Sequence, residues 1–245
     1  MMNITKRLVH LVLWGTCALL PLKTFALESI GKNPGVTDKV SAWIKSDLAK
    51  RPVSIGLRIP GKIIDSPPAQ PISVMIPRWP HVPFKHVYFS WEPQGHDPTG
   101  IYNVPHFDIH FYLLSNGARK AITCAGTDQA NCMKPIPAGA VPTNYAPTPE
   151  GVPKMGWHWV DLLSPEFHSQ PFTATMIYGY YNGQLAFIEP MITQAFFQSR
   201  QPFSAPIRQP LIFPKPGYYP TRYKISYTAV TDLYEVDLTN LVYRR

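Results

Sequence analysis

The sequence predicts an all-β fold, either an antiparallel β-barrel or a cupin-like sandwich, with one N-terminal helix and a proline-rich C-terminal arm. The chain contains 28 prolines, and beyond residue 52 they recur every few residues, which excludes long helices and continuous central strands. Short runs rich in β-branched and aromatic residues lie between them and favour strands. Asn182-Gly183, between two aromatic runs, is typical of a two-residue hairpin turn.

The first residues predict export. A basic pair precedes an apolar run over residues 8–22, and a small-residue cleavage motif ends at Ala26. This order predicts a signal peptide over residues 1–26 and a secreted or periplasmic protein. The alternative is a membrane anchor. Pro21 and Lys23 shorten the apolar run below the roughly 20 residues that a spanning helix needs, so no stable anchor is expected.

The expected elements divide the exported chain into three parts. Residues 27–52 form a helical segment, since residues 37–49 carry an apolar stripe of Val40, Trp43, Ile44 and Leu48 after a capping Thr37. Residues 53–200 form the β-barrel-like domain. Residues 201–245 form a proline-rich arm, linker or wrapping loop followed by C-terminal strands. The expected strands are residues 54–59, 72–76, 86–91, 107–114, 157–162, 172–180, 184–188, 222–230 and 234–242.

Two cysteines, Cys124 and Cys132, remain after the signal peptide. In an oxidising compartment an even pair around a short loop predicts a disulfide, which stabilises the fold by about 2–3 kcal/mol at most. The alternative is a pair of soft metal ligands, but their spacing matches no zinc ribbon.

Composition excludes several function classes. The formal net charge is +8, yet the basic residues are scattered and no base-reading motif occurs, so no nucleic-acid partner is expected. The sequence has no nucleotide-binding glycine loop, and no Gly-x-Ser-x-Gly elbow supports a serine nucleophile.

Polar residues within aromatic segments predict a metal site. The candidate ligands are His96, His106, His110, His158 and Glu189, which three segments supply. Buried polar groups without partners are costly, and a shared ion removes that cost. Imidazoles with a carboxylate suit zinc, iron or copper better than calcium or magnesium, and zinc is favoured.

Strand geometry limits this single site. The alternation over residues 107–114 places His106, Asp108 and His110 on one face. Residues two apart on a strand are about 6.6 Å apart and residues four apart about 13 Å, so His106 and His110 share an ion only if the strand bends near Pro105. The alternative is a helix, on which His-x3-His is ideal, but the aromatic content favours a strand. Glu189, which precedes a proline, is expected at a sheet end.

Beyond the predicted signal peptide, three further histidines, His81, His86 and His168, have proline-rich or polar neighbours and are expected to be ordinary.

Several motifs follow one another along the chain: Gly95-His96 with Pro105-His106-Phe107-Asp108-Ile109-His110-Phe111-Tyr112, Gly156-Trp157-His158-Trp159, Gly179-Tyr180-Tyr181-Asn182-Gly183 and Phe187-Ile188-Glu189-Pro190-Met191-Ile192-Thr193. In this order they resemble a family of uncharacterised secreted bacterial proteins with a β-barrel-like domain of unknown function. The resemblance covers residues 72–197 and implies a shared β domain and pocket, without an activity.

Asp108-Ile109-His110 is also similar to part of the α-type carbonic anhydrase zinc site. That family has a further His-x-His strand upstream, where this chain has Tyr88-Phe89-Ser90-Trp91. Zinc-hydratase activity is therefore not expected.

Two functions remain open. In the first, the protein is a metalloenzyme that acts on a small molecule, with Glu189 as ligand or general base and Asp108 orienting a histidine. In the second, it is a non-catalytic binding or assembly module with a structural or metal-sequestering site, and the proline-rich arm contacts a partner or a second subunit of a homo-oligomer.

Overall fold

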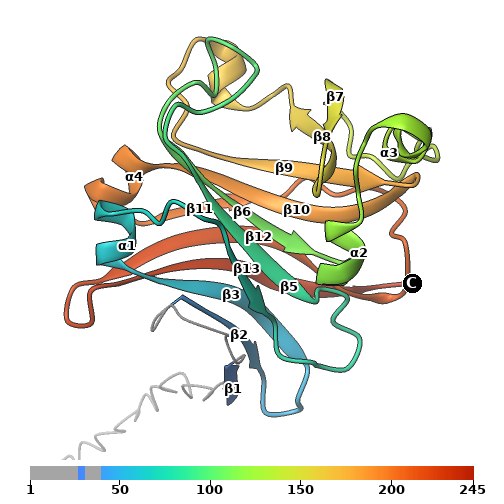
Figure 1. Cartoon of the computed structure of the whole chain (residues 1–245). Coiled ribbons are helices and arrows are strands. Elements are labelled where there is room, and N and C mark those ends of the chain that lie inside the picture. The colour runs from blue at the N-terminus through green and yellow to red at the C-terminus, as the bar shows by residue number, and fades with distance from the viewer. Residues whose placement is uncertain (1–26, 31–39) are drawn as a thin grey trace, which may run out of the picture.

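The computed structural model describes residues 27–30 and 40–245 and contains two antiparallel sheets (Figure 1). One sheet has the strand order β1-β2-β3-β13-β12-β11 and the other the order β4-β5-β6-β10-β9-β8-β7. Neither sheet closes on itself. The all-β prediction is confirmed, and of its two forms the sandwich is correct. The predicted signal peptide lies outside the described residues.

The first sheet unites the two ends of the chain. Its central strands β3 and β13 pair along their whole overlap, so the C-terminal strands share a sheet with the N-terminal segment. The strands are β1 (Leu27–Ile30), β2 (Ser41–Ser46), β3 (Pro52–Pro60), β11 (Phe203–Pro206), β12 (Gly217–Thr228) and β13 (Leu233–Arg244).

The second sheet is formed by the middle of the chain. Its strands are β4 (Ile72–Met75), β5 (His86–Glu92), β6 (His106–Tyr112), β7 (Tyr145–Val152), β8 (Gly156–Asp161), β9 (Ala174–Tyr181) and β10 (Gln184–Thr193). The predicted β9–β10 hairpin is confirmed, and both turn residues, Asn182 and Gly183, have positive φ angles of 53° and 71°.

The helices are short. They are α1 (Gly61–Asp65), α2 (Asn116–Lys120), α3 (Gln129–Cys132) and α4 (Gln194–Ser199), with 3-10 turns η1 (Gly126–Asp128) and η2 (Pro165–His168). Among the described helices, none combines the length and apolar character required to cross a membrane. The predicted Cys124–Cys132 disulfide is present.

The predicted N-terminal helix is wrong over its described part. Residues 41–46 form β2, which pairs with β1 on one side and β3 on the other. Ala42, Trp43 and Ile44 are all fully buried, so both faces of the segment are covered, whereas a surface helix would bury one stripe. Leu48, assigned to that stripe, is 68% exposed. Strand partners distant in sequence outweigh the local helical pattern.

The proline-rich stretch lies along the domain as a wrapping loop. Its first part forms the edge strand β11, which pairs with β12. Beyond β11, the backbone amides of Leu211 and Ile212 donate to the carbonyl of Gly139, and the carbonyl of Arg208 accepts from the Tyr178 hydroxyl. These bonds fix the stretch against the second sheet.

The main hydrophobic core lies between the sheets. From β6, Phe107, Ile109 and Phe111 point into it and are fully buried. The opposite face of β6 therefore carries the polar residues, as the alternation predicts. Loops cover that face and pack on it through a second apolar cluster that includes Tyr102 and Phe172.

Candidate metal centre

The covered face of the second sheet gathers the candidate ligands. His106, Asp108 and His110 point to this face from β6. On the neighbouring strand β10, the register pairs Ile188 with Phe111 and Met191 with Asp108, which sets Glu189 opposite His110. The ligands thus come from adjacent strands in register.

Glu189 does not lie at a sheet end, contrary to the sequence prediction. β10 continues through Pro190 to Thr193. Pro190 pairs with Met176 of β9, while the ladder to β6 omits Glu189 and Pro190. A proline lacks one donor and interrupts pairing locally. Because β10 is held on both sides, this gap does not end the strand, and Glu189 is in the middle of the sheet.

The structure gathers the candidate ligands into two groups rather than one. His96, His106 and Asp108 form the first, here called the rim triad because it lies where β6 begins; His110, His158 and Glu189 form the second, the buried triad. Within each triad the ligand atoms lie within 4.8 Å of one another. β6 pairs with β5 without a register shift, so no bulge in that ladder draws His106 toward His110.

The rim triad has the spacing of a ligand set. The Nε2 atoms of His96 and His106 are 3.1 Å apart, and those atoms lie 3.5 and 3.1 Å from the two carboxylate oxygens of Asp108. Two ligands bound to a tetrahedral zinc ion at 2.0–2.1 Å are about 3.4 Å apart. The three side chains thus leave room for one ion between them.

Backbone carbonyls orient both imidazoles of the rim triad. The Nδ1 atom of His96 lies 2.7 Å from the carbonyl oxygen of Asp97, and Nδ1 of His106 lies 2.7 Å from that of Val104. Since a carbonyl only accepts, each Nδ1 carries a proton, and in a neutral ring each Nε2 presents a lone pair. Two lone pairs and a carboxylate then face one another, an arrangement that a cation relieves. Metal-binding histidines are commonly oriented in this way.

Charge stabilises the rim triad even without an ion. Burial acts to lower the pKa of His96, but the hydrogen bond and charge of Asp108 outweigh it and raise that pKa to about 9. Burial acts to raise the pKa of Asp108, but hydrogen bonds from His106 and His96 hold it well below its usual range. The His96 side chain is 39% exposed, so the triad is open to solvent on that side.

The buried triad has similar spacing in a drier setting. Nε2 of His110 lies 3.3 Å from one carboxylate oxygen of Glu189, and Nε2 of His158 lies 3.6 Å from the other. Both ring nitrogens of His110, Nδ1 of His158 and one oxygen of Glu189 are buried without a hydrogen-bond partner. Each such group costs about 1–3 kcal/mol. A metal ion would satisfy several of them at once.

Burial keeps the buried triad uncharged when no ion is bound. Desolvation lowers the pKa of His110 to about 3 and that of His158 to about 4. Desolvation and the charge of Asp108 raise the pKa of Glu189 well above its usual value. Neutral imidazoles are the form that binds a metal, so only Glu189 has a proton to lose.

Gly179 lets His158 reach Glu189 across β9. The register sets Gly179 between His158 of β8 and Phe187 of β10. A Cβ atom at Gly179 would lie 1.9 Å from the Phe187 ring. Because Gly179 has no side chain, the Phe187 ring can lie over it. There the ring contacts His158, with the two ring centroids 5.0 Å apart.

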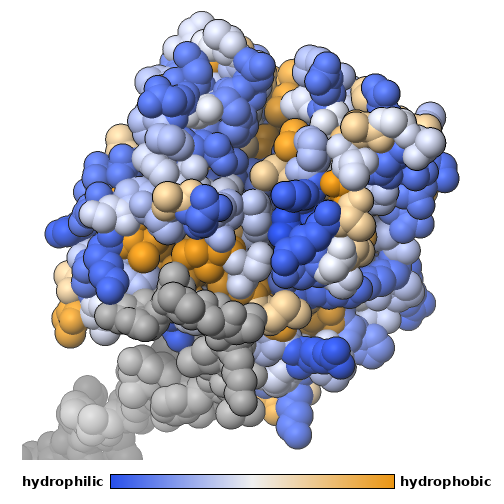
Figure 2. All heavy atoms as spheres, viewed as in Figure 1, coloured by the Kyte–Doolittle hydropathy of each residue, from blue (hydrophilic) through white to orange (hydrophobic). Residues whose placement is uncertain are grey.

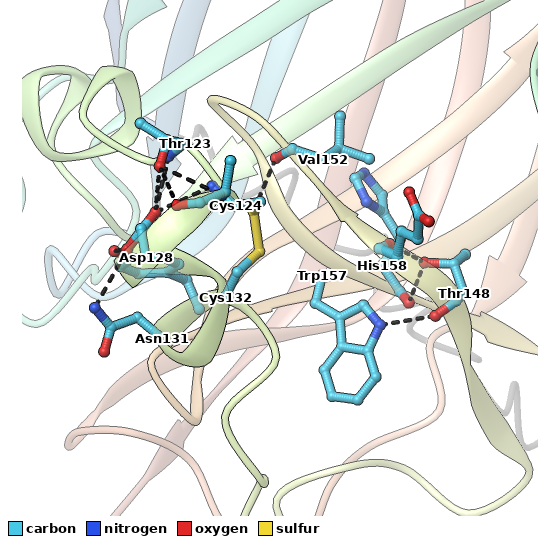
Figure 3. The surroundings of a disulfide bond; sticks show 12 residues. Thr123, Cys124, Asp128, Asn131, Cys132, Thr148, Val152, Trp157 and His158 are labelled. Carbon is cyan, nitrogen blue, oxygen red and sulfur yellow. Dashed lines mark hydrogen bonds between the residues drawn. A yellow bond between two sulfur atoms is a disulfide. The ribbon is translucent and has the colours of Figure 1, made fainter.

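The disulfide supports the hairpin that carries His158 (Figure 3). The sulfur of Cys124 lies 3.4 Å from the carbonyl oxygen of Val152 at the end of β7. Thr148 of β7 donates its hydroxyl to the His158 carbonyl, and Trp157 donates its indole N–H to the Thr148 carbonyl. The β7–β8 pair is thus fixed on both sides of His158.

The sequence did not predict two buried or half-buried residues of β5, the strand that lies beside the candidate ligands on β6. Glu92 of β5 is the register partner of His106 of β6. Burial and the charge of Asp108 raise the pKa of Glu92. His86, expected to be ordinary, is fully buried and stacked on Tyr112, and burial lowers its pKa to about 4. The predicted strand of residues 86–91 already began at His86, and one more residue on its period-2 pattern would have reached Glu92.

Of the histidines that the structure describes, His81, His86 and His168 lie outside both triads. His168 is exposed, and its Nε2 atom lies 3.1 Å from the Leu162 carbonyl oxygen.

No protein-family model, curated protein or solved structure matches this chain. The site is therefore interpreted from its own geometry.

Proposed function

We propose that this protein binds divalent transition-metal ions, one in each triad, and that zinc is the favoured metal. The observation that carries the proposal is the rim triad: three ligand atoms converge at 3.1–3.5 Å while both Nδ1 atoms are oriented by carbonyls. Two imidazoles and a carboxylate match zinc sites that keep a fourth position open. Asp108 then acts as a ligand rather than as an orienting group.

The two ions act separately. Asp108 and His110, from different triads, are two residues apart on β6 and so about 6.6 Å apart along the strand. Enzymes in which two metals share a substrate hold them about 3.5–4 Å apart. The rim and buried triads are better suited to different tasks, one ion reactive and the other stabilising the sheet.

Exposure favours the rim triad as the reactive one. Its His96 is 39% exposed, whereas the side chains of His110 and Glu189 are at most 1% exposed. His96, His106 and Asp108 would hold the ion, which would supply activation of water for the hydrolysis of a small molecule. Glu92 is the adjacent carboxylate for proton transfer, and Glu189 is a ligand of the buried ion. If both ions prove inert, a metal-sequestering or structural module is the alternative.

The disulfide fits an oxidising compartment, and the predicted signal peptide and the family resemblance agree with a secreted or periplasmic protein. A homo-oligomer remains a prediction.

Metal content tests the proposal. We expect protein purified from its native compartment to contain one ion per triad by elemental analysis, His106→Ala to lose the rim ion and His158→Ala the buried ion. His168→Ala is the control and should keep both. Absence of stoichiometric metal from wild-type protein, also after dialysis against zinc, would refute it.

A further inference from the structure

A groove at the β4 edge of the second sheet lies outside both triads. Its volume is about 840 Å³. Ser73 of β4 and Tyr88 of β5, which pair in register, form its floor, and α2 forms one wall. The surface in front of α2 is strongly hydrophilic (Figure 2). The groove is lined by Pro68, Gln70, Pro71, Ile72, Ser73, Met75, Tyr88, Asn116, Arg119, Lys120 and Lys154.

The charges of the groove have one sign. Arg119, Lys120 and Lys154 line it, and no acidic residue does. Among residues 27–30 and 40–245, no ion pair includes any of these three cations. Three cations around one concave surface raise the local concentration of anions.

Arg119 is held in place from several sides. It is 3% exposed, and its guanidinium donates to the Asn116 side chain and to the Lys154 carbonyl. The guanidinium also lies over the Tyr88 ring, 4.1 Å from its centroid. These neutral contacts reduce the cost of burying the charge, but none supplies a negative charge. A planar guanidinium fixed in this way is suited to bind a carboxylate or phosphate.

We propose that this groove binds the phosphate or carboxylate group of a small organic molecule. Arg119 and the exposed ammonium groups of Lys120 and Lys154 supply the charge, and Gln70 and Ser73 supply further donors. The volume falls in the range of small-molecule sites, about 300–1,000 Å³. The lining residues are distinct from both triads, so the groove binds its ligand whether or not metal is present.

The test is a titration of the exported protein, followed by backbone amide NMR, with glycerol phosphate, succinate and uncharged glycerol as probes. We expect the two anions to shift amides of Gln70, Ser73 and Lys120, and glycerol to shift none. A phosphate site and a carboxylate site are distinguished by which anion binds more tightly. Repeating the titration in EDTA should give the same affinity, which separates the groove from the metal proposal.

Matched variants decide the result. Lys120→Gln with Lys154→Gln should weaken anion binding about tenfold or more, since charged hydrogen bonds are lost. Lys50→Gln with Lys62→Gln removes the same charge elsewhere and should leave affinity unchanged. Arg119→Lys keeps the positive charge but removes the paired N–H donors of the guanidinium, so this variant should also bind the anion more weakly. Equal affinity of wild type and the Lys120/Lys154 variant, or equal weakening by both pairs, would overturn the proposal.

Discussion

The rim and buried triads contain the same ligand types, two histidines and one carboxylate, yet differ in their surroundings. In the rim triad each Nδ1 has a carbonyl acceptor, and His96 is open to solvent. In the buried triad, both ring nitrogens of His110 lack partners, and His158 is 13% exposed. The ligand types set which metals can bind, whereas hydrogen bonding and burial set how much the fold depends on the metal.

Proton chemistry follows the same division. Without metal, His96 keeps a proton near neutral pH and pairs with the Asp108 carboxylate, because the pKa of His96 is raised to about 9. The buried histidines take up no proton near neutral pH, since their pKa values are about 3 and 4. In the metal-free protein, a proton on His96 thus supplies positive charge to the rim triad, whereas no histidine of the buried triad carries such a charge.

The largest effect is expected from removing a ligand of the buried triad. His110→Ala should lose one ion and be destabilised by about 3 kcal/mol or more, because His158 and Glu189 remain buried without partners. For a domain of this size that is a fall in Tm of about 6–12 °C. A chelator should lower the Tm of wild type toward that of the variant and leave the variant unchanged. His168→Ala is the control, and a wild-type Tm indifferent to chelator would contradict the comparison.

Gly179→Ala tests the geometry of the buried triad without removing a ligand. The added Cβ would lie 1.9 Å from the Phe187 ring, and such overpacking typically costs 1–3 kcal/mol, here about 2. We expect the buried ion to be lost or weakened and the rim ion to be kept, by elemental analysis and thermal melting.

Gly117→Ala is the matched control, since nothing lies within 4 Å of a Cβ added there. In the short helix α2 it should be neutral or slightly stabilising. Equal metal loss in both variants would show that Gly179 has no specific role.

The sequence predicted most strands because their period-2 patterns and the Asn182-Gly183 turn are local signals. It failed at β2, because Val40, directly before the strand, and Trp43 and Ile44 within it fit a helical stripe as well as a strand. Only the pairing of residues 41–46 with β1 and β3 distinguishes the two, and those partners have no signature within the segment.

The candidate ligands could be found from residue type and aromatic context, but their division could not. It depends on the register that sets Glu189 opposite His110 and on the path of His158 across Gly179. The carbonyls of Asp97 and Val104 that orient the rim histidines are backbone groups. Since every residue has one, these contacts cannot be predicted from residue type.

A pH series on metal-free protein should give opposite trends for the two triads. The raised pKa of His96, about 9 in the fold against 6.5, means that its contribution is full below pH 6.5 and is lost as pH rises through 9. The lowered pKa of His158, about 4, means that its contribution is present above pH 6.5 and is lost as pH falls through 4.

The measurement is urea unfolding in EDTA at several pH values. The stability difference between wild type and His96→Gln should shrink toward high pH, and that between wild type and His158→Gln should shrink toward low pH. Parallel curves for the two variants would show that the triads do not differ in proton chemistry.

The smallest effect on stability is expected from His96→Gln when unfolding is measured in EDTA near neutral pH, where no bound ion contributes. The side chain is 39% exposed, and exposed charge pairs contribute about 0–1 kcal/mol, so Tm should change by no more than about 4 °C. In metal-loaded protein, metal content should nevertheless fall by the rim ion, because His106 and Asp108 alone are too few ligands for tight binding. Any metal-dependent hydrolytic activity should be lost with it, while the buried ion stays. A destabilisation as large as that of His110→Ala would mean that the rim triad is structural too. Retention of both ions would mean that His96 is not a ligand and that the open position lies elsewhere.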